Sequence, residues 1–223
     1  MALYYLCESH IPRPRSALKA AAYRAGEYLE HNGKRYDYTN RQDIVHSEII
    51  LPDRAPPDFS DRQTLWATAE NAEDNSTRRK TARVAHEIII AFPRELTFET
   101  SIIMARELIY KCFVSKGMCV DFNVHRGDRK DMGHVEADHK DILPHNPHGH
   151  IMLSTRHVGT DGFSKHKARE WESWGNPTLL VSWREEWANI QNKMFEQKGL
   201  EVRVSHERSV EREIDHGECS HDR

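Results

Sequence analysis

The spacing of apolar and polar positions along the chain predicts a mixture of helices and strands. Short or alternating apolar runs bounded by turn residues predict strands over residues 2–8, 34–38, 44–51, 84–92, 118–125, 148–155 and 200–204. Apolar residues at three- and four-residue intervals after a capping residue predict helices over residues 17–31, 61–74, 97–115 and 182–198. Because this order is not a regular alternation of strand and helix, it predicts an α+β fold, with a central antiparallel β-sheet covered by α-helices on one side.

The composition narrows the class of protein. The chain has 223 residues, of which 38% are apolar and 30% charged, which suits one large domain or two small ones and argues against disorder over most of its length. No run approaches the roughly 20 apolar residues of a membrane span, and the first residues lack the basic start and apolar core of a signal peptide. The cysteines show no CxxC spacing and are expected to be reduced thiols: Cys7, Cys112, Cys119 and Cys219. A cytoplasmic location is therefore expected.

Histidines on two predicted strands suggest a metal site. His148 and His150 lie two residues apart in a strand, so both imidazoles project from the same face. His125 ends the preceding strand on its polar face, and it would lie beside the pair if the two strands are antiparallel neighbours. Three imidazoles with open coordination positions are typical of a catalytic rather than a structural metal site. The alternatives are surface histidines with incidental metal affinity, or a third ligand from the charged loop of residues 127–146: His134, His139 or His145.

A local basic patch surrounds Tyr23. The net charge of −3 gives no overall signal for nucleic acid, so an anion site must be local. The residues around Tyr23 that could hold a phosphate are Arg13, Arg15, Lys19 and Arg24. Tyrosine is a poor nucleophile unless a metal-activated phosphate or a cation assists it, and the alternative is a half-buried core tyrosine. Tyr28 is expected on the same helix, about 140° around its axis from Tyr23, so both side chains cannot serve one phosphate.

Two carboxylates bracket the apolar strand of residues 84–92. Glu87 or Glu95 could support a histidine ligand through its second ring nitrogen or act as a general base. The alternative for each is a solvated carboxylate at a strand end. A further basic run, Arg78-Arg79-Lys80, precedes this strand.

Five segments of the chain resemble, in the same order, the relaxase domain of the MobA/MobL family, the MobQ class of plasmid mobilisation proteins within the HUH endonuclease superfamily. These segments are residues 1–4, 16–27, 46–52, 92–96 and 146–156. The resemblance implies a relaxase (HUH nuclease) domain over residues 1–205 with a palm-like antiparallel sheet. Residues 206–223 are expected to form a polar C-terminal tail or the start of a linker, because family members often continue into further domains.

The resemblance also implies roles for individual residues. Tyr23 is expected to be the nucleophile, and His125, His148 and His150 are expected to bind a divalent metal ion, Mn²⁺ or Mg²⁺. Glu87 and Glu95 remain the carboxylates expected near the catalytic centre. The residues expected to bind DNA are Arg13, Arg15, Lys19, Arg24, Arg78, Arg79, Lys80 and Arg156.

The implied activity is site- and strand-specific nicking and rejoining of DNA at a plasmid origin of transfer, through a 5′-phosphotyrosyl intermediate. The expected partners are single-stranded or hairpin DNA of that origin, accessory mobilisation proteins and a type IV secretion coupling protein. One alternative is a rolling-circle replication initiator, in which the tyrosine usually follows the His-x-His motif, whereas Tyr23 precedes it here. The other is a non-catalytic module that grips a DNA hairpin, which would leave the histidines unexplained.

Overall fold

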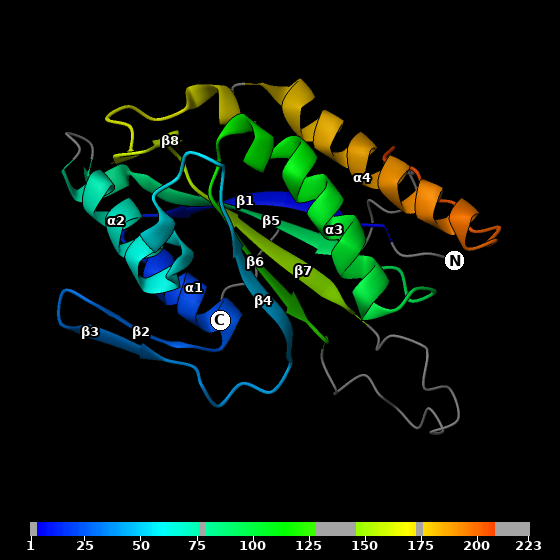
Figure 1. Cartoon of the computed structure of the whole chain (residues 1–223), viewed down its shortest axis with the longest axis horizontal. Coiled ribbons are helices and arrows are strands. Elements are labelled where there is room, and N and C mark those ends of the chain that lie inside the picture. The colour runs from blue at the N-terminus through cyan, green and yellow to red at the C-terminus, as the bar shows by residue number, and fades with distance from the viewer. Residues whose placement is uncertain (1–3, 76–78, 128–145, 173–175, 208–223) are drawn as a thin grey trace.

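A five-stranded antiparallel sheet forms the centre of the computed structural model, which describes residues 4–75, 79–127, 146–172 and 176–207. The strands follow the order β1-β5-β7-β6-β4 (Figure 1). They are β1 (Leu6–Pro12), β4 (Ile44–Ile50), β5 (Arg83–Ala91), β6 (Val120–His125) and β7 (His148–Leu153). Two hairpins lie outside this sheet: β2 (Tyr28–His31) with β3 (Lys34–Asp37), and β8 (Val158–Gly159) with β9 (Gly162–Phe163). The predicted α+β class and antiparallel sheet are confirmed.

The described part of the chain contains α1 (Ala17–Ala25), α2 (Arg62–Asp74), α3 (Phe98–Cys112) and α4 (Pro177–Gln197). Short 3₁₀ turns link the larger elements: η1 (Pro57–Ser60), η2 (Arg79–Thr81), η3 (Val114–Lys116) and η5 (Arg169–Trp171). The first three helices begin at the side chains of Ser16, Asp61 and Thr97, each of which accepts a backbone N–H of the first turn. These caps are the residues from which the helix starts were predicted. No helix of the described residues is long and apolar enough to cross a membrane.

Helices cover both faces of the sheet, not the single face that was predicted. Along β7, Ile151 and Leu153 belong to the apolar core that also contains the buried residues of α3 and α4. Met152, which points to the opposite face, belongs to a second core with the buried residues of α1 and α2. The prediction of one covered face was wrong because the polar positions of β6 and β7 do not face solvent; they face α1 and α2.

The first helix is shorter than predicted. It ends at Ala25 because Gly26 adopts a left-handed conformation with φ of 67°. A Cβ atom at this position would also lie only 3.1 Å from Ile44 Cγ1. The residues that follow form the β2–β3 hairpin, so Tyr28 lies on β2 and not on the helix of Tyr23. The helical prediction through residue 31 was therefore wrong.

The first strand, the last helix and the last predicted strand also differ from the prediction. The first strand begins at Leu6 and runs to Pro12, whereas residues 2–8 were predicted. The last helix begins at Pro177, five residues before the predicted start. Residues 200–204 form no strand; Asn192 on α4 holds this segment through the backbone N–H and C=O of Val204, at 2.9 Å each. These errors lie where a side-chain contact or a proline, not the apolar pattern, sets the boundary.

Candidate active site

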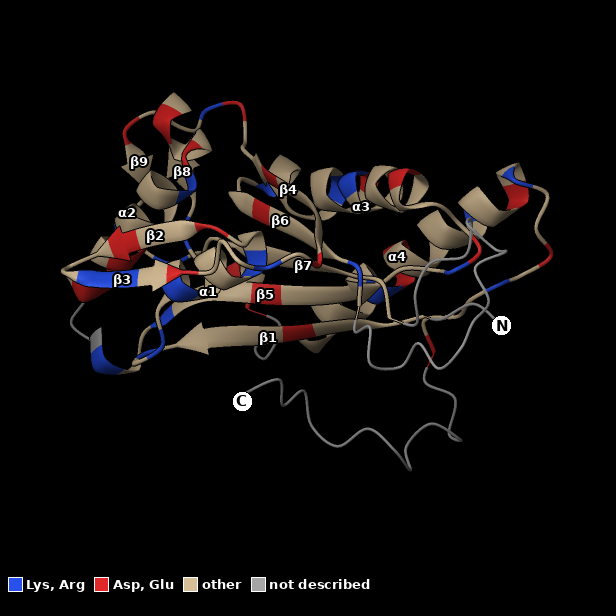
Figure 2. Ribbon diagram, turned by 90° about the horizontal axis from the view of Figure 1, so that it is seen from below, with Lys and Arg blue, Asp and Glu red and all other residues tan. Residues whose placement is uncertain are grey.

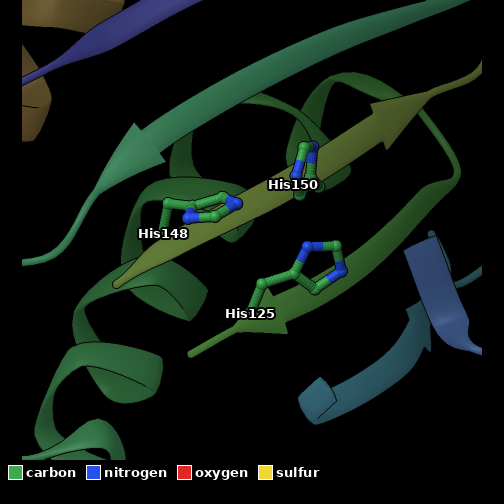
Figure 3. Close-up of side chains that lie close together, drawn as sticks. All are labelled: His125, His148 and His150. Atoms are coloured by element: carbon green, nitrogen blue, oxygen red, sulfur yellow. The ribbon is translucent and has the colours of Figure 1, made fainter. Parts of the chain in front are cut away.

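Three histidines converge on one face of the sheet, at the ends of β6 and β7 (Figure 3). His125 lies directly opposite His148 in the antiparallel register, and His150 is two residues farther along β7. The ring centroids are 5.3 Å apart for His125 and His148, 4.6 Å for His125 and His150, and 5.0 Å for His148 and His150. One ligand nitrogen from each ring lies within 4.8 Å of the other two. The arrangement expected from the sequence is present, while His134, His139 and His145 lie outside the described residues.

Glycine is needed between the two histidines of β7. A Cβ atom on Gly149 would lie 3.0 Å from Phe122 Cε2 and 3.2 Å from both Ile90 Cγ1 and Phe92 Cζ. The apolar core therefore fills the space behind the histidines, and it fixes the position of β7 in the sheet. This packing sets the direction in which His148 and His150 project.

Hydrogen bonds fix the tautomer of each ring. His125 Nε2 donates to the backbone carbonyl of Arg24 at 2.8 Å, and His148 Nδ1 donates to the carbonyl of Asn146 at 2.7 Å. His150 Nδ1 donates to Glu87 Oε1 at 2.9 Å. Because these oxygens are acceptors, the bonded nitrogens carry the protons and the other nitrogen of each ring keeps its lone pair. The nitrogen atoms that can bind a metal ion are therefore His125 Nδ1, His148 Nε2 and His150 Nε2.

Burial keeps His125 and His150 in the neutral form that binds metal. Burial, with a smaller contribution from the neighbouring His150, lowers the pKa of His125 to about 3. Burial also lowers the pKa of His150 to about 4, although the hydrogen bond to Glu87 opposes that shift. Three imidazoles, each held by a hydrogen bond through its other ring nitrogen, fit a divalent transition metal.

Glu87 lies beneath His150 in the contact that the sequence suggested. Arg24 on α1 donates to both carboxylate oxygens of Glu87 through Nε and Nη2. Burial acts to raise the pKa of Glu87, but the hydrogen bond from His150 and the charge of Arg24 outweigh it and lower the pKa to about 2. A carboxylate with so low a pKa is a weak general base, so its geometry favours orienting His150.

Glu95, the other predicted carboxylate, is exposed in the turn between β5 and α3. The hydrogen bonds described above for the three rings go to Arg24, Asn146 and Glu87.

Tyr23 lies on the last turns of α1 and is 46% exposed. The Tyr38 ring meets it edge-on, with centroids 5.2 Å apart. Arg41 lies over its ring, with Cζ 4.0 Å from the centroid, and Arg41 Nη1 donates to the Tyr23 backbone carbonyl at 2.7 Å. The next residue, Arg24, bonds His125 through its own carbonyl. The end of α1 thus joins Tyr23 to the histidine cluster.

The tyrosines Tyr4, Tyr28 and Tyr110 lie in different surroundings from Tyr23. Tyr28 Oη donates to Glu30 Oε2 at 2.7 Å on the β2–β3 hairpin, and this hydrogen bond raises the pKa of Tyr28. Tyr110 lies on α3, whose buried residues pack on the other face of the sheet. Tyr4 is half-buried and donates to the carbonyl of Arg184. Among these residues, only Tyr23 is followed in the chain by a residue that bonds the cluster.

A buried polar network on the same sheet face was not predicted. Arg62 on α2 donates to both carboxylate oxygens of Asp121, at 2.9 and 3.0 Å, and also pairs with Glu27. Ser47 on β4 accepts from Arg62 and donates to Asn123 at 2.7 Å. The network joins α2 to β4 and β6. The sequence signal for this network is the alternation of polar residues along β6, of which only His125 was assigned a role in the sequence analysis.

Several residues expected to bind DNA are engaged within the protein. Arg156 is 7% exposed and donates to Glu73 Oε1 at 2.8 Å, so its side chain has a partner within the protein. Arg24 holds Glu87, and Arg13 pairs with Asp74 at 2.6 Å. The side chains that remain exposed are Arg15, Lys19 and Lys80. Arg78 and the side chain of Arg79 lie outside the described part of the chain.

Comparisons with known proteins agree with the fold and with the sequence motifs. A mobilization protein MobL of Acidithiobacillus ferridurans is 32% identical over 234 residues, covering 96% of this chain and 60% of that protein. A conjugal transfer protein TraA of Agrobacterium fabrum is 32% identical over 181 residues, covering 75% of this chain and 15% of that protein. The chain thus spans less than two thirds of the length of these relatives.

A solved structure described as the molecular basis of vancomycin resistance transfer in Staphylococcus aureus has the same fold. It superposes with a TM-score of 0.77 at 28% identity, covering 93% of this chain and 100% of that one. The sequence model of the MobA/MobL family matches residues 15–221, and the chain belongs to this family.

Proposed function

We propose that this chain is a conjugative relaxase domain that nicks and rejoins one DNA strand at a plasmid origin of transfer. The observation that carries the proposal is the hydrogen bond from His125 Nε2 to the carbonyl of Arg24, the residue after Tyr23. It joins the helix end that carries the exposed Tyr23 to a cluster of three imidazoles. This combination of a nucleophile and a site for a metal is what phosphoryl transfer through a covalent intermediate requires.

His125, His148 and His150 would hold one divalent ion, Mn²⁺ or Mg²⁺, which supplies charge stabilisation to the scissile phosphate when bound. Tyr23 Oη attacks the phosphorus atom and the bond to the 3′ oxygen breaks. The products are a 5′-phosphotyrosyl link and a free 3′-OH. The tyrosine loses one proton and the 3′ oxygen gains one, so the step is balanced. One phosphoester replaces another, which allows the same site to rejoin the strand.

The expected substrate is an unpaired strand or a hairpin of the origin of transfer. One backbone phosphate must reach both Tyr23 and the histidines, and an unpaired strand can bend into that position more easily than a duplex. Exposed cations would contact neighbouring phosphates: Arg15 just before α1, Lys19 on α1, and Lys34 and Arg35 on β3. Figure 2 shows basic residues on β3. Accessory mobilisation proteins and a type IV secretion coupling protein are the further partners that we propose.

The two alternatives from the sequence differ in what they explain. A module that only binds DNA does not need three imidazoles oriented by Arg24, Asn146 and Glu87. A rolling-circle initiator would share the chemistry, but Tyr23 precedes the His-x-His motif in the chain. Membership of the MobA/MobL family also favours mobilisation over replication.

A covalent adduct tests the proposal. Single-stranded oligonucleotides tiled across the DNA that flanks its gene, labelled at the 3′ end, are incubated with the protein and Mn²⁺ and separated on a denaturing gel. We expect the 3′ label to migrate with the protein, because the 5′ end of the downstream fragment is the one attached. Chelation of the metal should remove this band, and a duplex of the same sequence should give much less of it. Equal adduct with and without metal would contradict the proposal, and so would equal adduct on duplex and single strand.

A further inference from the structure

A second cluster of metal-ligating side chains lies on the other face of the sheet from the histidine triad. Glu8 and His10 come from the edge strand β1, and His86 comes from its neighbour β5. His86 and Glu87 are consecutive in β5, so their side chains point to opposite faces. Glu87 contacts His150, which places the Glu8, His10 and His86 cluster on the face of α3 and α4. The proposed DNA chemistry uses none of these three residues.

The backbone register brings the three side chains together. His10 is the antiparallel partner of His86, and Glu8 is two residues from His10 on the same face of β1. The two rings are 4.8 Å apart between centroids. Glu8 Oε1 lies 3.2 Å from His86 Nδ1 and 3.7 Å from His10 Nε2. In a tetrahedral zinc site with bonds of about 2.0–2.1 Å, neighbouring ligand atoms are about 3.4 Å apart. One ligand atom from each of the three side chains lies within 4.8 Å of the other two, so a small closing movement would bring all three onto one ion.

The chemical state of the cluster also suits a cation. The side chains of Glu8 and His86 are only 2% and 4% exposed. His10 Nε2 is buried and has no hydrogen-bond partner among the residues that the structure describes. Burial, with a smaller contribution from the neighbouring His86, lowers the pKa of His10 to about 4. This ring is therefore neutral at pH 7. Its lone pair is therefore available to a metal.

Two imidazoles and one carboxylate form a set of ligands that binds zinc and similar transition metals more tightly than it binds magnesium. Two opposite charges also act on His10: the Arg83 guanidinium acts to lower its pKa, and the Glu172 carboxylate acts to raise it. Because these two charges oppose one another, the attraction for a divalent cation comes mainly from the Glu8 carboxylate within the cluster.

We propose that Glu8, His10 and His86 bind a second divalent transition-metal ion of the Zn²⁺ class, independently of the His125, His148 and His150 site. Such an ion would fasten the edge strand β1 to β5 from the side opposite the catalytic centre. Because it would bind the folded chain and not the separated strands, it would stabilise the fold in proportion to the logarithm of the free metal concentration.

Metal stoichiometry separates the two sites. The protein is loaded with Zn²⁺, dialysed, and measured by elemental analysis and by calorimetric titration with Zn²⁺ alone. We expect two tight sites per chain, one after His10→Ala, one after His148→Ala and none in the double variant. His166→Ala removes an exposed histidine that belongs to neither cluster and should leave both sites. A single tight site that His148→Ala abolishes would overturn the proposal, and so would an unchanged stoichiometry in His10→Ala.

A second variant guards against loss of folding. Glu8→Gln keeps the size of the side chain and its capacity to accept a hydrogen bond but removes the charge. We expect its metal-free melting temperature to stay close to that of the parent, while Zn²⁺ affinity at this site falls at least tenfold and the Zn²⁺-dependent rise in melting temperature shrinks. If the metal-dependent rise is the same in the parent and in Glu8→Gln, the three residues form only a hydrogen-bonded cluster and the proposal fails.

Discussion

The backbone carbonyl of Arg24 accepts a hydrogen bond from His125 Nε2 at 2.8 Å, while the guanidinium of the same arginine grips Glu87. Glu87 in turn accepts from His150. Arg24, at the end of α1, therefore contacts His125 directly and His150 through Glu87. The residue before Arg24 is Tyr23. Any displacement of this helix end would move the tyrosine and the triad together, which links the orientation of the nucleophile to the geometry of the metal ligands.

Replacement of Tyr23 by phenylalanine should eliminate the covalent adduct. The substitution removes only the hydroxyl, so the edge contact with Tyr38 and the contact with Arg41 remain possible. DNA affinity should therefore stay within a few-fold of the parent value in a filter-binding measurement. Tyr28→Phe is the matched control, because Tyr28 is equally exposed but lies on β2 and bonds Glu30. A phosphonucleotide found by peptide mass spectrometry on Tyr28 or another tyrosine would refute the assignment.

Arg41 should act as a positioning residue for Tyr23. A cation over an exposed aromatic ring contributes about 0.5–1 kcal/mol, and the hydrogen bond to the Tyr23 carbonyl adds to it. We expect Arg41→Ala to slow adduct formation about 3- to 10-fold at saturating DNA, with a smaller change in DNA affinity. Arg41→Lys should recover part of the rate, since it keeps the charge without the planar group.

The control for Arg41 is Arg169→Ala, which removes an exposed arginine from η5. Its rate of adduct formation should match that of the parent. If Arg41→Ala lowers DNA affinity as much as it lowers the rate, Arg41 acts by binding DNA and not by positioning the tyrosine.

Glu87→Gln should weaken metal binding without removing any ligand. The amide cannot hold the His150 N–H as strongly as the carboxylate, and loss of a contact of this kind typically costs 10- to 100-fold in metal affinity, so a loss of about that size is expected. Calorimetric titration with Mn²⁺ measures the change. Glu95→Gln is the matched control, because Glu95 is the exposed carboxylate at the other end of the same chain segment. Equal Mn²⁺ affinity in the parent and in Glu87→Gln would show that Glu87 does not support the site.

The triad could be predicted from the sequence because its geometry follows from strand periodicity. His148 and His150 must share a face, and the alternating polar residues of β6 placed His125 on the face that meets them. Contacts between distant segments could not be predicted in the same way. Arg41 reaches Tyr23 only because the helix ends at Gly26 and the β2–β3 hairpin turns the chain back, and a single glycine after an alanine-rich run gave too weak a signal for that turn.

The basic residues of the sequence predicted contacts with DNA less well than strand periodicity predicted the histidine triad. Arg156 was expected to bind DNA, yet it is buried against Glu73, which lies far away in the sequence. Arg24 was expected to hold phosphate and instead holds Glu87. The fold decides which anionic group lies next to a basic side chain. The sequence alone does not show whether that group is a carboxylate of the protein or a phosphate of DNA.

The metal-free protein should lose stability as the pH falls below 6.5. Burial, as the largest cause, lowers the pKa of His125 to about 3 and that of His150 to about 4, whereas an unfolded histidine has a pKa of about 6.5. Between these values the unfolded chain binds more protons than the folded chain, so its population grows. At pH 5 the free energy of unfolding should fall by roughly 2 kcal/mol for each such buried group.

Urea unfolding at pH 7.5, 6.0 and 5.0 in the presence of a chelator measures this pH dependence. His150→Asn should show a smaller loss between pH 7.5 and 5.0 than the parent, because it lacks one of the titrating rings. A free energy of unfolding that stays constant over this range would contradict the neutral, buried state of the two rings.

Arg156→Ala should lower the stability of the fold and not the affinity for DNA. The arginine is 7% exposed and Glu73 is fully buried, and Arg156 also donates to the carbonyl of Ser164 at 3.1 Å. Removal of one partner of a buried ion pair costs about 3–5 kcal/mol because the other charge is left buried; Lys167, which lies 3.2 Å from Glu73, would offset part of that cost. Arg15→Ala is the comparison, since Arg15 is exposed. It should weaken DNA binding and reduce its salt dependence while the urea midpoint stays unchanged. A stable Arg156→Ala protein with weakened DNA binding would restore this arginine to the DNA-binding surface.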